Sequence, residues 1–226
     1  MLQSFGGLDY FIARIAPTLG LEWAIRGGGS GNDQINSGGI IAGSDGLIYV
    51  TGTFTGTSNI GGAVSVSRGD ADVFLASYDA TGTWTGFIRT FGGTGTDGVS
   101  GFARDASGNF FLSGSFQGTV DFDPGAGIHL VAGLGTGGAA DSYVLSLTPT
   151  GDFRWVDPLS ASIAGDQNFA IAGGVSLAGD GTIWAVGRFY GVVNFAPGGT
   201  AVVRQSVGDA DQFVVRYDQT TGAIRQ

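Results

Sequence analysis

The chain has 226 residues, of which 44 are glycine, only 5 are proline and 42% are apolar. This composition supplies enough apolar residues for a core, and it excludes collagen-like and proline-rich linker structures. The formal net charge is −9, with all ten cations arginine and all but one of the 19 acids aspartate. Such a surface repels phosphate backbones, so we expect no nucleic-acid partner.

The missing residue types exclude several chemistries. The sequence has no cysteine, no lysine, one glutamate (Glu22) and one histidine (His129). Thiolate and Schiff-base catalysis, disulfides and cysteine–histidine zinc sites are therefore excluded. No apolar run approaches the roughly 18 residues needed to cross a bilayer, so we expect no membrane insertion. The N-terminus has no basic segment, and Asp9 interrupts its apolar stretch, so we predict no signal peptide.

Four sequence patterns recur in the same order, with a period of about 67 residues that is too long for a solenoid coil. The first is a strand-like run that begins with aspartate, at Asp9, Asp72, Asp141 and Asp211. The second is Gly-x-Phe-x-Gly, with its phenylalanines at Phe54, Phe116 and Phe189 and its first glycines at Gly52, Gly114 and Gly187. The third is a tryptophan after a glycine-containing turn, at Trp23, Trp84 and Trp155. The fourth is an aspartate in a glycine-rich connection, at Asp33, Asp97 and Asp166.

In chain order, the patterns divide the sequence into four units. Residues 1–30 hold only the outer strands of a first unit, and residues 31–92 hold a complete second unit. In 93–162 we predict strands at 98–105, 109–116, 141–148 and 153–159, with hairpin turns at 105–109 and 149–152 and an extended hairpin in the loop 117–140. In 163–226 we predict strands near 170–178 and 182–189 and another at 210–218.

The second strand of each unit is apolar on successive residues, as in "LIYV", "FFL" and "IWAV". Such runs are typical of strands buried on both faces, whereas a two-layer sandwich would show alternation. Sheets in a radial stack bury both faces, because each sheet lies between two neighbours. We therefore predict an all-β chain folded as a β-propeller of four-stranded antiparallel blades, with a partial blade at 1–30 and full blades at 31–92, 93–162 and 163–226.

Propellers close with about four to eight blades, so we expect other copies of the chain, or the rest of a longer chain, to complete the ring. Both ends of this sequence carry the same third strand, 8–16 and 210–218. We therefore expect that the two ends cannot complete one blade together, and that this edge is exposed.

The order of these elements, together with "FQGTVDFDPGAG" (116–127), resembles the bacterial SBBP-type β-propeller repeat family in its long-loop form carrying VDFDPGAG. A weaker copy, "FYGVVNFAPGG" (189–199), lies one unit later, and the corresponding segment 54–62 has lost the DFDPG element. The resemblance covers nearly the whole chain. It implies a propeller in an extracellular or cell-surface protein, and it implies no catalytic residue.

Aspartates two residues apart are the candidate metal ligands. They occur as Asp121 with Asp123, Asp70 with Asp72, and Asp209 with Asp211. Such a pair could offer two oxygen ligands to Ca²⁺, but the third acid, glycine and distant glutamate of an EF-type loop are missing. The favoured alternative is a turn in which the carboxylates accept backbone N–H groups. Asp121 and Asp123 are the best metal candidates, and we predict no other metal, cofactor or catalytic residue.

The recurring Asp33, Asp97 and Asp166 each precede the first strand of a unit. They could line a channel and bind a cation, or they could tie their connections to the neighbouring unit through backbone hydrogen bonds. Recurrence in every unit favours the structural role. We assign the tryptophan and phenylalanine series to the core between units rather than to sugar stacking. We expect His129 to be solvated or half-packed, without the partners of a catalytic triad.

We expect a non-catalytic propeller module, not an enzyme, that acts in assembly, adhesion or presentation in a secreted or cell-surface protein. Its expected partners are other copies of itself or the remainder of a longer propeller chain. The first alternative is a propeller that binds glycan or Ca²⁺ through the loops 54–70, 117–140 and 190–209, which differ between units. The second alternative is a carboxylate-dependent glycosidase or lyase, which a single Asp→Asn change at Asp33, Asp97 or Asp166 should inactivate.

Overall fold

The regular elements of the chain are β-strands. The structure, a computed structural model, describes residues 2–134, 140–161, 169–196 and 200–225. The strands of these ranges are β1 (Tyr10–Ile15), β2 (Leu21–Gly29), β3 (Gln34–Ala42), β4 (Ile48–Ile60), β5 (Ala63–Tyr78), β6 (Trp84–Gly93), β7 (Gly98–Arg104), β8 (Phe110–Phe116), β9 (Thr119–Asp121), β10 (Leu130–Ala132), β11 (Asp141–Leu147), β12 (Phe153–Ala161), β13 (Phe169–Leu177), β14 (Thr182–Tyr190), β15 (Val192–Asn194), β16 (Val203–Gln205) and β17 (Asp211–Asp218). The described part of the chain contains no helix with the length and hydropathy of a membrane span.

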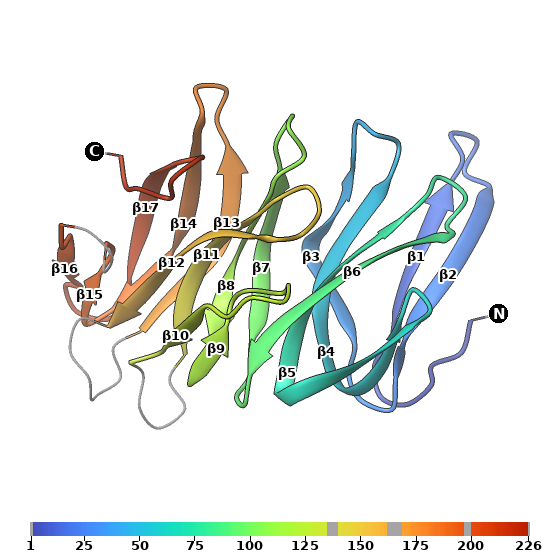
Figure 1. Cartoon of the computed structure of the whole chain (residues 1–226), viewed down its shortest axis with the longest axis horizontal. Helices are drawn as coiled ribbons and strands as arrows, with labels where there is room; N and C mark the ends of the chain where they lie inside the picture. The colour runs from blue at the N-terminus through green and yellow to red at the C-terminus, as the bar shows by residue number, and fades with distance from the viewer. Residues whose placement is uncertain (1, 135–139, 162–168, 197–199, 226) are drawn as a thin grey trace.

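The strands pair as successive antiparallel meanders, which we number as four units. Unit 1 is β1–β2, unit 2 is β3–β4–β5–β6, unit 3 is β7–β8–β11–β12 and unit 4 is β13–β14–β17. Figure 1 shows the units side by side along the long axis of the molecule, from unit 1 in blue to unit 4 in orange and red. The all-β, antiparallel class is confirmed.

The hairpins predicted inside unit 3 are also present. Asp105 N donates to Asn109 O (3.0 Å), and Gly108 completes this turn with a φ of 87°. Gly151 has a φ of 78° in the second turn, where Thr148 N donates to Asp152 O. These left-handed conformations explain why both turns contain glycine. The arms of the expected extended hairpin are β9 and β10, and β15 and β16 form the corresponding hairpin in unit 4.

Unit 4 differs from the expected four-stranded blade, because it has three full strands. In the described residues, its fourth strand is represented by one bridge, between Tyr217 and Ile224, and by the hydrogen bond from Arg225 N to Arg216 O. The outer edge of β17 is therefore mostly unpaired with described strands, and a cavity of about 570 Å³ lined in part by Phe213 and Val215 lies along it.

Each unit is joined to the next through the end of its fourth strand. Residues 28–29 of β2 pair with β4, residues 92–93 of β6 pair with β9, and residues 160–161 of β12 pair with β15. In every case the partner is the hairpin arm that extends from the next unit. The first strands β3, β7 and β13 lie next to one another in turn.

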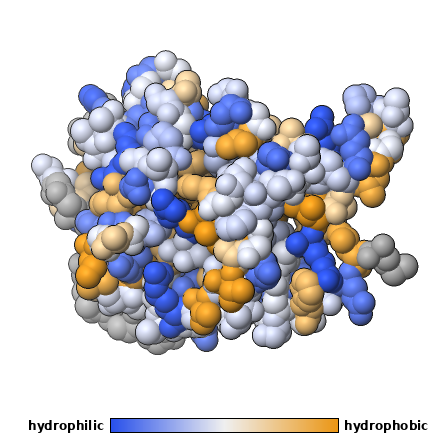
Figure 2. Space-filling view, turned by 45° about the vertical axis from the view of Figure 1, so that its right-hand side comes forward, coloured by the Kyte–Doolittle hydropathy of each residue, from blue (hydrophilic) through white to orange (hydrophobic). Residues whose placement is uncertain are grey.

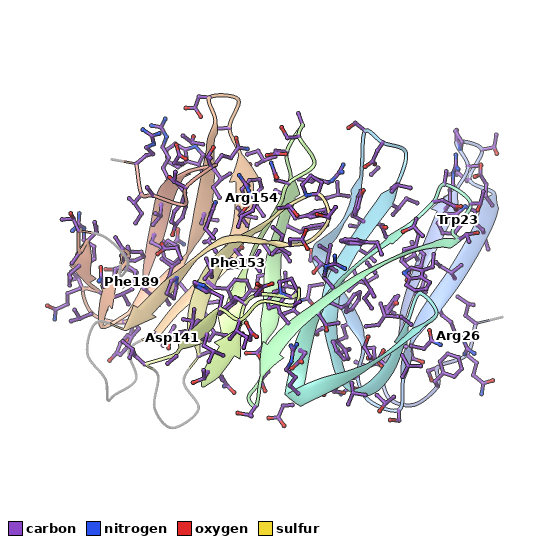
Figure 3. The ribbon with its side chains drawn as sticks, in the orientation of Figure 1. Trp23, Arg26, Asp141, Phe153, Arg154 and Phe189 are labelled. Carbon is purple, nitrogen blue, oxygen red and sulfur yellow. The ribbon has the colours of Figure 1, made fainter. Side chains whose placement is uncertain are left out.

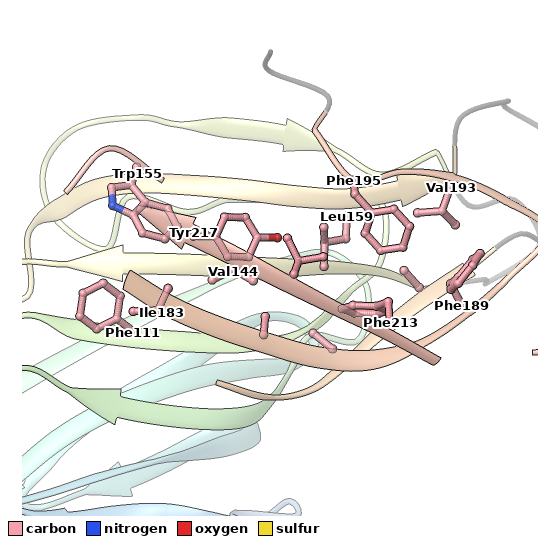
Figure 4. Close-up of a cluster of buried hydrophobic side chains, with 14 residues drawn as sticks. Phe111, Val144, Trp155, Leu159, Ile183, Phe189, Val193, Phe195, Phe213 and Tyr217 are labelled. Carbon is pink, nitrogen blue, oxygen red and sulfur yellow. The ribbon is translucent and has the colours of Figure 1, made fainter. Parts of the chain in front are cut away.

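Apolar clusters fill the three spaces between successive units. Between units 1 and 2, the ring of Tyr10 stacks on that of Phe74 with centroids 5.4 Å apart. Between units 2 and 3, Phe91 meets the edge of Tyr143 at 5.8 Å. Burial of one such side chain contributes about 1.5–3 kcal/mol, so these clusters hold the units together. The third cluster, between units 3 and 4, includes Phe111, Val144, Leu159, Ile183 and Phe213 (Figure 4).

Burial on both strand faces is confirmed for two of the three second strands. In β8, Phe110, Phe111 and Leu112 are all fully buried, and Tyr49 and Val50 of β4 are buried too. The prediction is wrong for β14. Its Trp184 is 39% exposed and Val186 is 47% exposed, because no described unit lies against that face.

Candidate functional site

The aspartate pair after β9 is used by the backbone of its own loop. Asp121 Oδ1 accepts hydrogen bonds from Asp123 N (3.1 Å) and His129 N (2.8 Å), and Asp123 Oδ1 accepts one from Gly125 N (2.8 Å). Between them, Phe122 is fully buried against Phe116 and Tyr143. These are the bonds of the turn alternative. They fix the loop so that Phe122 enters the core.

Unit 4 builds the same loop without the carboxylate. Asn194 takes the place of Asp121, and its Oδ1 accepts from Ala196 N (3.1 Å) and Val202 N (3.0 Å). Phe195 is buried as Phe122 is. In unit 2, Asn59 Oδ1 accepts from Gly62 N (2.8 Å). A neutral amide oxygen therefore meets the structural need of this position, which requires an acceptor rather than a charge.

The series Asp33 and Asp97 lies in the joints between units. Asp33 Oδ2 accepts from Gly29 N (2.8 Å), and Asp97 Oδ2 accepts from Gly93 N (2.6 Å). The backbone N–H of each also donates to the preceding unit, from Asp33 N to Leu8 O (2.6 Å), just before β1, and from Asp97 N to Ala71 O (2.8 Å), in β5. Asp166, the third member, lies outside the described residues.

The aspartates that begin the third strands close a second set of turns. Asp72 Oδ2 accepts from Arg68 N (3.0 Å) and Asp211 Oδ2 from Val207 N (2.9 Å). Asp141, at the start of β11 (Figure 3), accepts from Leu134 N (2.6 Å), and Asp9 accepts from Phe5 N. Each carboxylate thus fixes the segment that leads into its strand.

The two aspartate series meet, which the sequence patterns did not reveal. A Cβ added at Gly92 would lie 2.5 Å from Asp72 Cγ and 2.9 Å from Asp97 Oδ2, so both carboxyls surround this glycine. Burial raises the pKa of Asp97 to about 6, against the lowering effect of its backbone hydrogen bonds, and the charge of Asp72 adds to the rise. Burial likewise raises the pKa of Asp72 and of Asp33.

The alternative in which Asp33, Asp97 and Asp166 line a channel does not fit the two members that the structure describes. Asp33 and Asp97 are at most 1% exposed, as is Asp72, so solvent does not reach them. The joints therefore use these acids as hydrogen-bond acceptors.

The tryptophan series is not one structural series. Trp23 and Trp155 lie on turns of the next unit, with their indole N–H groups donating to Ala80 O (3.1 Å) and Gln219 O (3.3 Å). Strand register shows that Phe87 has the equivalent place in unit 2, because Ile88 pairs with Ala76 as Ala24 pairs with Ala13. Trp84 lies outside that register and packs on the β4–β5 hairpin at 61–62.

The other aromatic predictions place residues in the core. Phe54 and Phe116 are fully buried, and Phe189 is 6% exposed. His129 is on the surface and stacks on Phe153 with ring centroids 4.3 Å apart, so it is half-packed as expected. These contacts account for the side chains without a bound sugar.

Asp157 is the acid that the repeat analysis missed. It lies on the same face of β12 as Trp155 and Leu159, two residues from each, and it borders a cavity of about 760 Å³ together with Trp155 and Ile224. Its Oδ2 atom and the Tyr217 hydroxyl are both buried and lie close enough to interact. Burial raises the pKa of Asp157 to about 7, although the nearby Tyr217 hydroxyl opposes part of the rise. The sequence did contain a signal for this site, because Asp157 lies two residues from an apolar core residue on each side.

The free energy of unfolding is expected to fall as the pH rises from about 4 to about 7. An acid whose pKa is higher in the folded state binds more protons when the chain is folded. Its contribution to the free energy of unfolding is therefore complete below its unfolded pKa and is lost as the pH rises through its folded pKa. Asp157 and Asp97 both act in this direction. Asp157→Asn should flatten the profile, and its difference from the parent should grow by roughly 4 kcal/mol between pH 4 and pH 8, at about 1.4 kcal/mol for each pKa unit.

Urea unfolding at each pH measures this profile. Asp209→Asn removes one charge at an exposed position and is the control, whose profile should run parallel to that of the parent. A parent profile that rises between pH 4 and 7 would contradict the assignment of raised pKa values to Asp97 and Asp157 in the folded chain.

No protein-family model matches the sequence. The chain is similar to Regulatory protein FlaEY of Caulobacter vibrioides, with 29% identity over 188 residues. The match covers 79% of this chain but 18% of that protein. The chain is thus similar to a segment of a much longer protein and spans less than a fifth of that protein's length.

Proposed function

We propose that this chain is a non-catalytic β-propeller repeat module whose units 1 to 4 are successive blades. In this proposal it acts in assembly, adhesion or presentation within a secreted or cell-surface protein. The observation that carries the proposal is that the same connection between units occurs three times. In each, the end of the fourth strand pairs with the hairpin of the next unit, and an apolar cluster fills the space between the two sheets.

The arrangement of the strands supports blades rather than a flat stack. First strands β3, β7 and β13 adjoin one another, while the fourth strands reach the following unit through its hairpin. In a propeller, the first strands of successive blades adjoin one another around the central axis, and the fourth strands lie on the outer rim. The surface setting rests on the resemblance to SBBP-type repeats. Similarity to part of a longer protein also fits a module that occurs within longer chains.

The non-catalytic part of the proposal is supported by how the carboxyls are used. Asp33, Asp72 and Asp97 are buried acceptors in the joints, and Asp121 and Asp123 hold a loop. In the described ranges, no group of three or more histidine or acidic side chains is placed to hold a metal ion. Each of these carboxyls has a structural task in the joints or the loop.

A calcium test separates this module from a Ca²⁺-binding propeller. We expect millimolar Ca²⁺ to leave the melting temperature unchanged within about 1 °C, and Asp121→Asn to lower stability by less than about 1 kcal/mol. The reason is that Asn194 already makes the same two hydrogen bonds in unit 4. Thermal melts with Ca²⁺ and with a chelator measure both effects. A stabilisation by Ca²⁺ that Asp121→Asn abolishes would replace this proposal with the calcium-binding one.

A second candidate, glycan binding, is favoured by the cavity of about 760 Å³ beside Trp155 and Asp157. An aromatic wall and a carboxyl are groups that recognise sugars, and pockets of this size hold small ligands. Glycan-array binding that is lost in Asp157→Asn but kept in Asp209→Asn would support this candidate. No binding by the parent chain would leave the scaffold role as the proposal.

A further inference from the structure

The repeat gives every unit two chemically distinct faces. We call the face toward the following unit its front and the opposite face its back. In the third strands the front position is held by Ile12, Leu75, Val144 and Val214. The adjacent back position is held by Phe11, Phe74, Tyr143 and Phe213.

Wherever two described units adjoin, a front meets a back. Tyr10, on the front of unit 1, stacks on Phe74, on the back of unit 2. Val144, on the front of unit 3, packs in one cluster with Phe213, on the back of unit 4. These positions are almost closed to solvent, since Phe74 and Val144 are both 0% exposed. One type of interface therefore occurs three times within the chain.

The front of unit 4 is an open copy of that interface. Val214 is 63% exposed, although its equivalent Val144 is fully buried. On β14, Trp184 and Val186 are open beside it. The guanidinium of Arg216 lies 5.6 Å from the Trp184 ring and pairs with Asp180 at 2.8 Å, so its charge is held at the rim of this face.

The back of unit 1 is open as well. Phe11 is 67% exposed, whereas the equivalent Phe74 and Tyr143 are fully buried. Ile15 on the same face of β1 is 54% exposed, and Leu21 at the start of β2 is 63% exposed. Figure 2 shows apolar side chains, in orange, at the surface near the N-terminal end. The molecule thus carries one open front and one open back.

We infer that a second copy of this chain docks head to tail, with the back of its unit 1 against the front of unit 4. We assign a second copy to this face because, in the three interfaces within the chain, the front of one unit is always covered by the back of the next unit. The contact would bury Phe11 and Ile15 against Trp184, Val186 and Val214. It is heterologous, so each end copy keeps one free face and the association continues as a ring or a row. This inference rests on the proposed function as a repeat module.

The concentration dependence of the molar mass tests the docking. We expect the weight-average mass to rise from the 22.9 kDa of one chain to at least twice that value between about 5 and 500 μM. Val214→Arg blocks the front and Phe11→Arg blocks the back. Each variant alone should remain monomeric, because every contact needs one of each face. Light scattering and sedimentation velocity measure the mass.

Mixing the two variants gives the decisive result. An equimolar mixture should form a dimer and nothing larger, since only one intact front and one intact back remain for each pair. Val64→Arg alters a valine on the β4–β5 hairpin that is 71% exposed, against 63% for Val214, and this variant should associate like the parent. If either variant fails to match the parent in circular dichroism, Val186→Arg and Ile15→Arg replace the pair.

Other outcomes overturn the docking. A parent mass that stays at one chain across this range would do so, as would variants that block association yet form no dimer when mixed. Blocking by only one of the two variants would indicate a symmetric contact instead. A monomeric chain with unchanged calcium and glycan behaviour would leave the scaffold function standing, so the two proposals fail separately.

Discussion

Phe74→Ala is expected to lower the free energy of unfolding by about 3–5 kcal/mol, whereas Phe11→Ala should change it by less than about 0.5 kcal/mol. The two residues hold the same position in third strands one repeat apart. Phe74 is fully buried, stacking on Tyr10 and lying 6.5 Å from the Phe54 ring, and Phe11 is 67% exposed. Position in the repeat and residue type are the same, but β5 lies between β4 and β6, whereas β1 pairs with β2 alone among the described strands. The difference therefore reports the burial of Phe74 against Tyr10 of unit 1 and against Phe54 of its own unit.

Urea unfolding at a few micromolar, where we expect the chain to be monomeric, measures both changes. Because contacts in the stack run between neighbouring units, loss of Phe74 should loosen unit 1 before units 3 and 4. The chain has four tryptophans, so variants that keep only Trp23 or only Trp155 would report the two ends separately if the transition splits. Equal losses in both variants would show that the face of Phe11 is covered, and would contradict the open back of unit 1.

Gly114→Ala is expected to destabilise the chain by about 3 kcal/mol, which is large for the addition of one methyl group. A Cβ at this position would lie 2.0 Å from Gly98 O and 2.9 Å from the Tyr143 hydroxyl. That hydroxyl donates to the same carbonyl at 2.9 Å, so the methyl group would displace β7 and break this bond. Gly52 and Gly187 face the same obstruction, from Gln34 O at 1.9 Å and from Ile171 O at 2.1 Å.

Gly173→Ala is the matched control for this prediction. Gly173 is also a strand glycine, but an added Cβ would meet only Val186 O, at 3.8 Å. We expect a change within about 0.5 kcal/mol in either direction. Denaturant midpoints of the two variants and the parent measure the contrast. A neutral Gly114→Ala would mean that β7 does not approach β8 as closely as described.

Much of the organisation could be predicted from the sequence, because each signal is local or recurs. The turns at 105–109 and 149–152 need glycine with positive φ, so their positions are visible in the chain. The Gly52, Gly114 and Gly187 series reflects a contact repeated in units 2, 3 and 4. A contact that every repeat must make leaves the same residue at the same spacing along the sequence, and we predicted the strand order from these recurring residues.

The tryptophan series shows where this reasoning fails. Trp84 matches Trp23 and Trp155 in type and in its distance from a turn, but a register shift between Ala76 and Tyr78 gives that structural place to Phe87. Gly86, with a φ of 90°, lies in the extra residues that precede Phe87. A bulge changes which residue faces the neighbouring unit without changing the local composition. The sequence therefore did not reveal that Phe87, rather than Trp84, takes this place.

The sequence by itself determined the repeat, the strand class and the hairpin turns, because these depend on backbone conformation and on which residues recur along the chain. Only the tertiary structure decided that Asp72 meets Asp97, that Asp157 is half-buried beside a cavity, and that Trp184 and Phe11 remain exposed. The physical reason is that burial and pKa depend on which unit lies opposite a residue. A strand that is apolar on both faces looks the same in the sequence whether or not a neighbour covers it.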